Sequence, residues 1–201
     1  MEFKLKVSPS LLAADYGYLA DAAIMAEKGG AEAVHVDYMD GHYVPNISFG
    51  LELIPALRSR VSIPLVAHLM ISNTAERLED FIKTRPDYIV IQEDVQKDLK
   101  SVVTTIRKSG IKPGVAINPD RPLNAIYDVL PDIDLLIVLS VFPGFGGQKF
   151  MPDTLHKMEQ AHNFRMENQL HYDLGVDGGV NMETSRKIVK TGANVLIAGT
   201  A

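Results

Sequence analysis

The sequence contains no cysteine among its 201 residues. This absence excludes a disulfide framework and every metal site built on thiolate ligands. It also suits a reducing compartment, so we expect a cytoplasmic protein. No apolar run approaches the roughly 20 residues of a membrane-spanning helix, and residues 1–6 lack the apolar core of a signal peptide. We therefore expect a soluble protein with no membrane partner.

Charge of one sign is not concentrated in this sequence either. The 25 acidic and 20 basic residues give a net charge of −5 and a pI near 5.7. This balance gives no reason to expect nucleic acid or an anionic membrane as a partner. With 46% hydrophobic and 22% charged residues, the composition is that of an ordinary globular protein. We expect a single domain over residues 1–201.

Short β-branched runs alternate with longer amphipathic stretches along the whole chain. The runs predict strands at residues 7–12, 33–40, 63–70, 88–92, 112–117, 134–140, 171–176 and 194–198. The amphipathic stretches predict helices at residues 15–28, 51–59, 73–83, 97–109, 122–130, 153–168 and 182–191. Asp15 is a plausible N-cap of the first helix.

Eight strands, each but the last followed by a helix, indicate an α/β protein with a (β/α)₈ TIM barrel. An open doubly wound sheet is the alternative, but it normally has fewer strands, and no GxGxxG motif follows the first strand. The sequence stops at Ala201, where an eighth helix would begin. Either the sequence shown is truncated or the closing helix is missing, and we expect the groove between the first and seventh helices to be covered by a tail or a partner.

Potential metal ligands first occur together in the second predicted strand. His35, Asp37 and Met39 point to one face, because side chains alternate along a strand. In isolation, a His-x-Asp pair is more often a buried histidine that is hydrogen-bonded to its neighbour. The pair therefore needs support from the rest of the chain.

The barrel supplies this support, because working residues lie at the carboxyl ends of its strands. The residues at these ends are Ser10, Asp37, Met39, His68, Met70, Ser140 and Asp177. Two histidines and two carboxylates form a mixed nitrogen and oxygen set, suited to Zn²⁺, Fe²⁺, Mn²⁺ or Co²⁺. Separately, His68 is explained as a core histidine and Asp177 as a helix cap. These explanations do not predict that the residues converge at one mouth.

Glycines occur in three consecutive loops at the same end of the barrel. They follow the sixth, seventh and eighth strands as Gly144, Gly146 and Gly147, then Gly178 and Gly179, then Gly199 with Thr200. Glycines let backbone N–H groups approach an anion, and barrels often hold a phosphate beside the last two loops. Ordinary turn chemistry would explain one such loop, whereas three together favour a phosphate site.

Several motifs occur in the order of one known family. They are Ser8-Pro9-Ser10, HVDYMDGH at residues 35–42, VPN at 44–46, HLM at 68–70, Asn118-Pro119, PGFGGQ at 143–148 and VDGG at 176–179. As a set they closely resemble the ribulose-phosphate 3-epimerases and the related allulose-6-phosphate 3-epimerases. The resemblance runs from Ser8 to Thr200 and implies the same barrel fold.

The resemblance implies an isomerase that inverts C3 of a phosphorylated ketose through an enediolate. It implies one divalent metal ion, held by His35, Asp37, His68 and Asp177, with Asp37 and Asp177 as the acid–base pair. Zinc or iron(II) is the first expectation, and manganese(II) or cobalt(II) the second. It also implies substrate contacts from Ser10, Met39, His68, Met70, Asp177 and the glycine loops, with Met39 and Met70 near the reaction plane. A homo-oligomer is a further possibility.

The sequence departs from the family pattern at three positions in the expected pocket. Gln92 stands where the family usually has a histidine, Leu139 replaces a frequent methionine, and Phe142 replaces a usually polar residue. None of these changes removes an expected ligand. They leave open whether the substrate is D-ribulose 5-phosphate or a hexulose phosphate such as D-allulose 6-phosphate.

Two other functions are compatible with a phosphate-binding barrel. The 3-hexulose-6-phosphate synthase and decarboxylase group has a D-x-K-x-x-D motif, but Met39 stands where its lysine would be. A non-catalytic sugar-phosphate-binding barrel would have no reason to keep four ligands and two acid–base aspartates.

Overall fold

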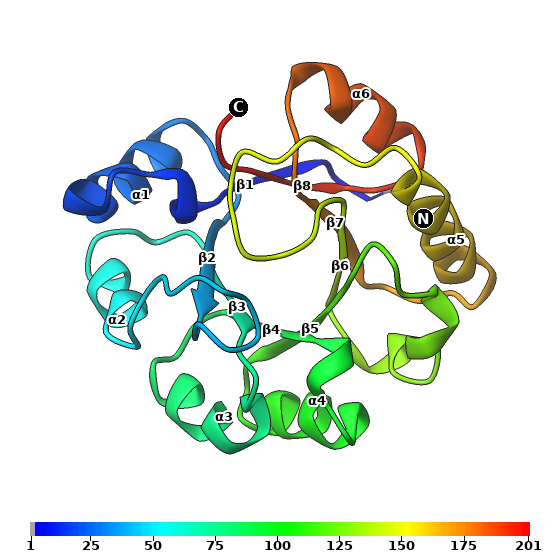
Figure 1. Ribbon diagram of the computed structural model, residues 1–201, viewed down its shortest axis with the longest axis horizontal. Helices are drawn as coiled ribbons and strands as arrows, with labels where there is room; N and C mark the ends of the chain where they lie inside the picture. Colours follow the sequence, from blue (N-terminus) through cyan, green and yellow to red (C-terminus); the bar gives the residue numbers. More distant parts are fainter. Residues whose placement is uncertain (1–2) are drawn as a thin grey trace.

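Eight parallel strands form a nearly closed barrel with helices around it (Figure 1). The computed structural model describes residues 3–201. The strand order is β1-β8-β7-β6-β5-β4-β3-β2, and a parallel bridge between Ser10 and His35 links the two end strands. The predicted barrel is confirmed, and the alternative of an open doubly wound sheet is wrong.

The strands lie where the sequence predicts them, mostly within two residues. Their bounds are β1 Lys6–Pro9, β2 Val34–Met39, β3 Leu65–Met70, β4 Tyr88–Gln92, β5 Lys112–Ile117, β6 Leu135–Leu139, β7 Asp173–Asp177 and β8 Val195–Ala198. The first strand ends earlier than expected, because the hydroxyl of Ser10 accepts from the backbone N–H of Leu12 and caps a 3₁₀ turn at Leu11–Ala13.

Six α-helices cover the outside of the barrel. They are α1 Leu19–Lys28, α2 Leu53–Arg58, α3 Thr74–Lys83, α4 Leu99–Lys108, α5 Thr154–Glu167 and α6 Met182–Lys190. Asp15 caps a 3₁₀ turn at Tyr16–Tyr18, and α1 begins only after it.

The helix predicted at residues 122–130 is wrong. Two 3₁₀ turns, Leu123–Ile126 and Leu130–Asp132, connect β5 to β6 instead. Pro131 lies in the first turn of the second of these, where its missing backbone N–H is tolerated. Leu123, Ile126 and Leu130 are nevertheless buried, so the connection covers the sheet without an α-helix.

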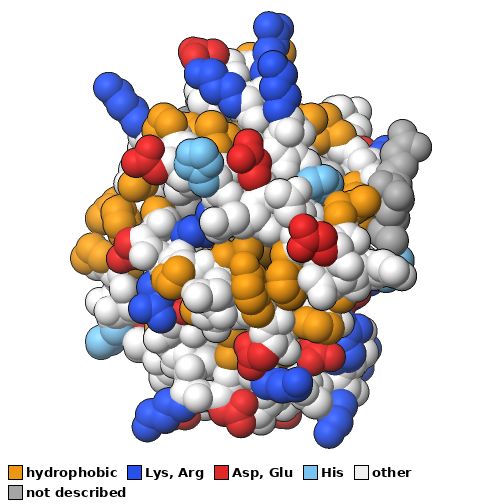
Figure 2. Space-filling model, turned by 90° about the vertical axis from the view of Figure 1, so that its right-hand side faces the viewer, with side chains coloured by type: hydrophobic (Ala, Val, Ile, Leu, Met, Phe, Trp, Pro, Cys, Tyr) orange, Lys and Arg blue, Asp and Glu red, His pale blue; other side chains and the backbone are white. Residues whose placement is uncertain are grey.

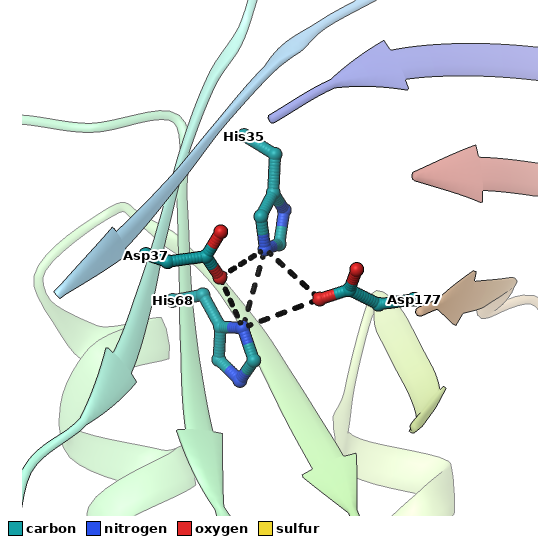
Figure 3. Close-up of side chains that lie close together, drawn as sticks. All are labelled: His35, Asp37, His68 and Asp177. Atoms are coloured by element: carbon teal, nitrogen blue, oxygen red, sulfur yellow. Dashed lines mark hydrogen bonds and ion pairs between the residues drawn. The ribbon is translucent and has the colours of Figure 1, made fainter. Parts of the chain in front are cut away.

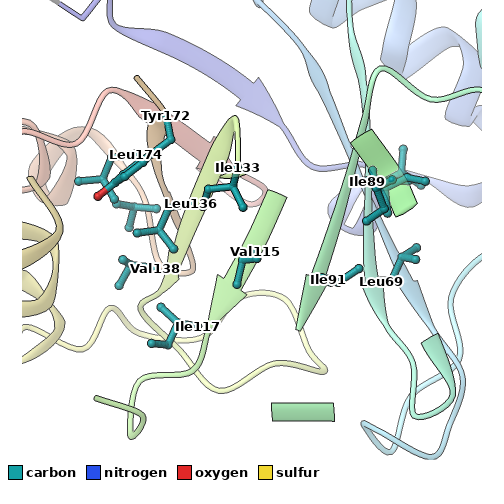
Figure 4. Close-up of a cluster of buried hydrophobic side chains, with 14 of the residues drawn as sticks. Leu69, Ile89, Ile91, Val115, Ile117, Ile133, Leu136, Val138, Tyr172 and Leu174 are labelled. Atoms are coloured by element: carbon teal, nitrogen blue, oxygen red, sulfur yellow. The ribbon is translucent and has the colours of Figure 1, made fainter. Parts of the chain in front are cut away.

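The core has two layers, because alternate residues of each strand face opposite sides. In β4, Ile89 and Ile91 pack outward in the layer between sheet and helices (Figure 4), whereas Val90 points into the barrel. Gly114 of β5 faces the interior at the same level, and a Cβ atom there would lie 2.8 Å from a methyl group of Val90. The barrel is thus filled by small and branched side chains at this level.

Residues 199–201 follow β8 at the end of the sequence. Beside this position, Val7 on β1 is 40% exposed and the preceding Leu5 is 46% exposed. The expectation that a partner or tail covers this apolar strip stays a prediction.

Acidic and basic side chains are interspersed on the face that Figure 2 shows. In residues 3–201, no helix combines the length and the apolar character needed to cross a bilayer.

Candidate active site

Four potential metal ligands meet inside the barrel near its carboxyl end (Figure 3). His35 and Asp37 come from β2, His68 from β3 and Asp177 from the end of β7. The register of β2 and β3 pairs Asp37 with His68, while Asp177 reaches the group from the other side. One ligand atom from each residue lies within 4.8 Å of the other three. The convergence expected from the sequence is therefore present.

Short distances connect the members of this cluster. Oδ1 of Asp37 lies 3.0 Å from His35 Nε2 and 3.0 Å from His68 Nδ1, and these two nitrogens are 3.2 Å apart. Oδ2 of Asp177 lies 3.8 Å from His35 Nε2 and 4.0 Å from His68 Nδ1. Ser10 donates a 2.7 Å hydrogen bond to the other oxygen of Asp37.

The donor set fits a small divalent cation. Tetrahedral ligands at about 2.0–2.1 Å from a zinc ion lie roughly 3.3 Å from one another. The ligand atoms of His35, Asp37 and His68 lie 3.0–3.2 Å from one another. Oδ2 of Asp177 lies 3.8–4.0 Å from the two histidine nitrogens, less than 1 Å beyond the tetrahedral spacing. Both imidazoles are fully buried and aim a ring nitrogen at the same point.

The two carboxyl groups of the cluster have opposite protonation behaviour. Burial opposes the charged form of Asp37, yet the adjacent His35 and His68 hold the pKa of its carboxyl well below the ordinary value. Burial, together with the negative charge of Asp37, raises the pKa of Asp177 to about 7. Near neutral pH, one carboxyl group is ionised while the other binds and releases a proton easily.

The histidines differ as well. Burial lowers the pKa of His68. Burial also opposes the charged form of His35, but the carboxylate of Asp37 outweighs it and raises the pKa of that imidazole.

A narrow cavity of about 80 Å³ opens above the cluster. Asp37 lines it together with nearly all predicted substrate contacts: Ser10, Met39, Met70, Gly144, Gly146, Gly147, Asp177, Gly178, Gly179, Gly199 and Thr200. His68 is the exception, since its imidazole is fully buried below the cavity. Ser140, at the end of the predicted sixth strand, also lies outside the lining and donates hydrogen bonds to the carbonyls of Asp177 and Gly178.

The glycine loops leave room for each other only because they lack side chains. Gly178 and Gly179 have φ angles of +110° and +61°, which disfavour other residues. A Cβ atom at Gly179 would lie 2.4 Å from the backbone nitrogen of Phe150. These contacts hold the loop after β7 against the loop after β6.

Two basic residues near the glycine loops were missed in the sequence. A second cavity of about 440 Å³ is lined by Gly147, Gly179 and Thr200 together with Lys149 and Lys187. Lys187 comes from α6, so its place beside the glycine loops depends on how this helix packs. It also pairs with Glu183 at 3.0 Å.

Of the three residues that depart from the family pattern, two line the narrow cavity and one does not. Leu139 and Phe142 line the narrow cavity as expected, together with Val141. Gln92 does not line it, because its side chain is buried against His68. The sequence shows that Gln92 departs from the family pattern, but it did not predict the contact with His68.

The chain is similar to known proteins over nearly its whole length. The model of the ribulose-phosphate 3-epimerase family matches residues 6–201. Ribulose-phosphate 3-epimerase of Treponema pallidum is 36% identical over all of this chain and 92% of its own length. The Bacillus subtilis protein of that name is 38% identical over 98% of this chain and 91% of its own length. The chloroplastic ribulose-5-phosphate 3-epimerase of Arabidopsis thaliana is 39% identical over 97% of this chain and 70% of its own length.

Among solved structures, a mutant tryptophan synthase α-subunit of Pyrococcus furiosus superimposes with a TM-score of 0.75, over 98% of this chain and 88% of its own. At 18% identity, this likeness shows the fold alone. The family match extends from β1 to the residues after β8 and includes all the cluster residues. The chain therefore belongs to the ribulose-phosphate 3-epimerase family.

Proposed function

We propose that the protein is a metal-dependent isomerase that interconverts D-ribulose 5-phosphate and D-xylulose 5-phosphate by inverting C3. Family membership and the names of the relatives support the reaction and the substrate. The observation that carries the mechanism is the pair Asp37 and Asp177, which approach one point from β2 and β7 and have pKa values shifted in opposite directions.

Inversion next to a ketone removes a proton from one face of the carbon and returns a proton to the other face. It needs two acid–base groups on opposite sides of the substrate, one charged and one protonated. In each direction one of Asp37 and Asp177 would act as the carboxylate base and the other as the acid, and after one turnover the roles are exchanged. In the metal-free chain, burial and the negative charge of Asp37 raise the pKa of Asp177 to about 7, so this carboxyl group can hold a proton near neutral pH.

His35, Asp37, His68 and Asp177 would together hold the divalent ion, with zinc or iron(II) as our first choice. When bound, such an ion supplies Lewis-acid stabilisation of negative charge on the substrate oxygens. Ser10 orients Asp37 through its hydrogen bond. The buried side chains of Met39 and Met70 make an apolar wall that offers no strong hydrogen bond to an enediolate.

Solvent-deuterium exchange tests the reaction and the substrate together. We expect deuterium to enter C3 of ribulose 5-phosphate as xylulose 5-phosphate forms, and to enter allulose 6-phosphate much more slowly. Exchange into allulose 6-phosphate alone would reassign the substrate. No exchange into either sugar by the metal-loaded protein would contradict the proposed reaction.

We further propose that residues 1–201 act as one catalytic domain in the cytoplasm and that the protein forms a homo-oligomer. The family match over residues 6–201 supports a single catalytic domain, and the lack of cysteine supports a cytoplasmic location.

The phosphate group would lie on the glycine loops, and Gly146 offers a direct test. No atom lies within 4 Å of a Cβ placed at Gly146, so the position accepts a side chain without strain. At an effective dielectric constant of about 20, two negative charges about 6 Å apart repel by about 3 kcal/mol, or roughly 100-fold in binding. We expect Gly146→Asp to raise KM for the sugar phosphate by about 10- to 100-fold, measured by steady-state kinetics.

Gly146→Ala is the matched control, since it fills the same space without charge. Its KM should stay within about threefold of the parent value. Equal KM values for both variants would place the phosphate elsewhere.

Metal binding should depend on pH because ligands must lose their protons. Below about pH 7, Asp177 retains a proton that the incoming cation has to displace, so affinity rises as the pH rises toward that value. We expect zinc binding at pH 6 to release about one proton or more, and clearly fewer at pH 8. Calorimetry in buffers of different ionisation enthalpy measures this number, and a heat independent of the buffer at pH 6 would contradict the prediction.

A further inference from the structure

Gln92, the last residue of β4, lies with its side chain fully buried against the imidazole of His68. The amide nitrogen of Gln92 is 2.9 Å from Nε2 of His68. The other ring nitrogen, Nδ1, faces the cluster and lies 3.0 Å from Oδ1 of Asp37. The imidazole therefore connects the candidate metal ligands to Gln92.

The position of one proton decides what this imidazole can do. A neutral imidazole carries its proton on one nitrogen and a lone pair on the other. With the proton on Nδ1, His68 donates to Asp37 and accepts at Nε2 from the amide of Gln92, an arrangement that matches the distances in the structure. With the proton on Nε2, Nδ1 is free to bind a cation, and the Nε2–H group then needs an acceptor.

The carbonyl oxygen of the same amide can be that acceptor. Oε1 of Gln92 is buried and has no hydrogen-bond partner among the residues that the structure describes. The two ends of an amide have nearly the same shape, so a half-turn about the Cγ–Cδ bond exchanges them within the same space. After this half-turn, Oε1 accepts from Nε2–H of His68, and both groups are satisfied.

We propose that Gln92 is a positioning residue that holds His68 in the tautomer required for cation binding, by turning its amide so that Oε1 accepts from Nε2–H. This inference rests on the proposed metal site. An amide can both donate and accept, so it satisfies His68 with and without the cation and adds no charge to the buried site.

The second histidine of the cluster has no comparable partner. Nδ1 of His35 is buried without a hydrogen bond to any part of the chain described in the structure. Of the two histidines, only His68 has its outer nitrogen in contact with a side chain that can select the tautomer. A change at position 92 should therefore act directly on His68.

Zinc affinity and the ring tautomer test the proposal in four proteins: the parent, Gln92→Met, Gln92→Glu and Gln96→Met. Methionine keeps the length of the side chain but cannot accept a normal hydrogen bond, whereas glutamate accepts and cannot donate when ionised. Gln96→Met is the matched control, because Gln96 is half-buried nearby and forms no hydrogen bond with His68.

Competition with a chromophoric chelator measures the zinc affinity, and nitrogen-15 NMR of the imidazole identifies the protonated nitrogen. We expect zinc to bind Gln92→Met about 10- to 100-fold more weakly than the parent, the usual effect of losing such a partner. Gln92→Glu and Gln96→Met should bind at least as tightly as the parent. In the metal-free proteins, Gln92→Glu should shift the proton of His68 toward Nε2, and Gln96→Met should not.

Equal zinc affinity of Gln92→Met and the parent would overturn the role of Gln92 while leaving the metal site intact. So would an equal loss in Gln92→Glu, since the acceptor would then not matter. A parent protein that binds no zinc would overturn the metal site and the role of Gln92 together. Circular dichroism and thermal unfolding of each variant separate these outcomes from misfolding.

Discussion

Asp177→Asn should lower the turnover number for ribulose 5-phosphate by about three orders of magnitude or more. A general acid–base group contributes about 10²- to 10⁴-fold to the rate of such a step. Inversion at C3 always requires proton transfer on both faces of the carbon, including the face that Asp177 would serve. Asparagine has nearly the same size as aspartate and retains a carbonyl oxygen, so the loss would reflect proton transfer. Steady-state kinetics in both directions measures the effect.

Deuterium exchange makes this prediction sharper. In Asp177→Asn, Asp37 can still remove a proton from C3 of one epimer and return deuterium to the same face. We expect deuterium to enter only one of the two pentulose phosphates, without inversion. Asp37→Asn should show the reverse preference and should also weaken metal binding, because Oδ1 of Asp37 contacts both histidines.

Asp173→Asn is the matched control for these variants. Asp173 lies on the same strand, at the opposite end, and pairs with Lys6 at 2.5 Å. This variant should retain turnover within about threefold of the parent. Full epimerisation by Asp177→Asn would show that another group moves the proton on that face.

Arg165→Ala should destabilise the fold by about 3–5 kcal/mol, the range of large truncations in a protein core. Arg165 on α5 is fully buried, and its guanidinium donates to the carbonyls of Tyr172 and Gly192 and to the side chain of Asn194. These contacts join α5 to the segments before β7 and β8. Alanine would leave a cavity and several buried oxygens without their donor.

Thermal unfolding checks this prediction against Arg186→Ala, an exposed arginine on the neighbouring α6. For a chain of this size, about 1 kcal/mol corresponds to roughly 2–4 °C, so Arg165→Ala should lower Tm by about 6–20 °C. Arg186→Ala should change it by no more than about 2 °C. Arg165→Lys should also be destabilised, because an ammonium group cannot reproduce the planar set of donors. Equal Tm values for Arg165→Ala and Arg186→Ala would contradict a structural role.

Secondary structure was predictable where the apolar pattern and the flanking residues both indicate the same element. The β4 and β5 bounds agree with the sequence at both ends, because short apolar runs are flanked there by charged residues, glycine and proline. The segment after β5 was not predictable in the same way. Apolar spacing at residues 122–130 resembles that of a helix, but the chain forms two 3₁₀ turns there, and the spacing of buried residues does not distinguish the two structures.

The candidate site was predictable to the level of which residues converge. Parallel strands bring their carboxyl ends to one mouth, so Asp37, His68 and Asp177 had to lie at the same end of a barrel. The chain alone did not determine which ring nitrogen of His68 faces the cluster. That depends on the side-chain rotamer, which neighbouring strands select through packing.

The sequence by itself determined the order of strands, the barrel and the identity of its polar end residues, because alternation and spacing along one chain encode them. Only the tertiary structure decided which side chains touch across strands. The 2.9 Å contact between Gln92 and His68 and the burial of Arg165 are two such facts. Both depend on the register and packing of segments far apart in the chain, and residue order does not specify either of these directly.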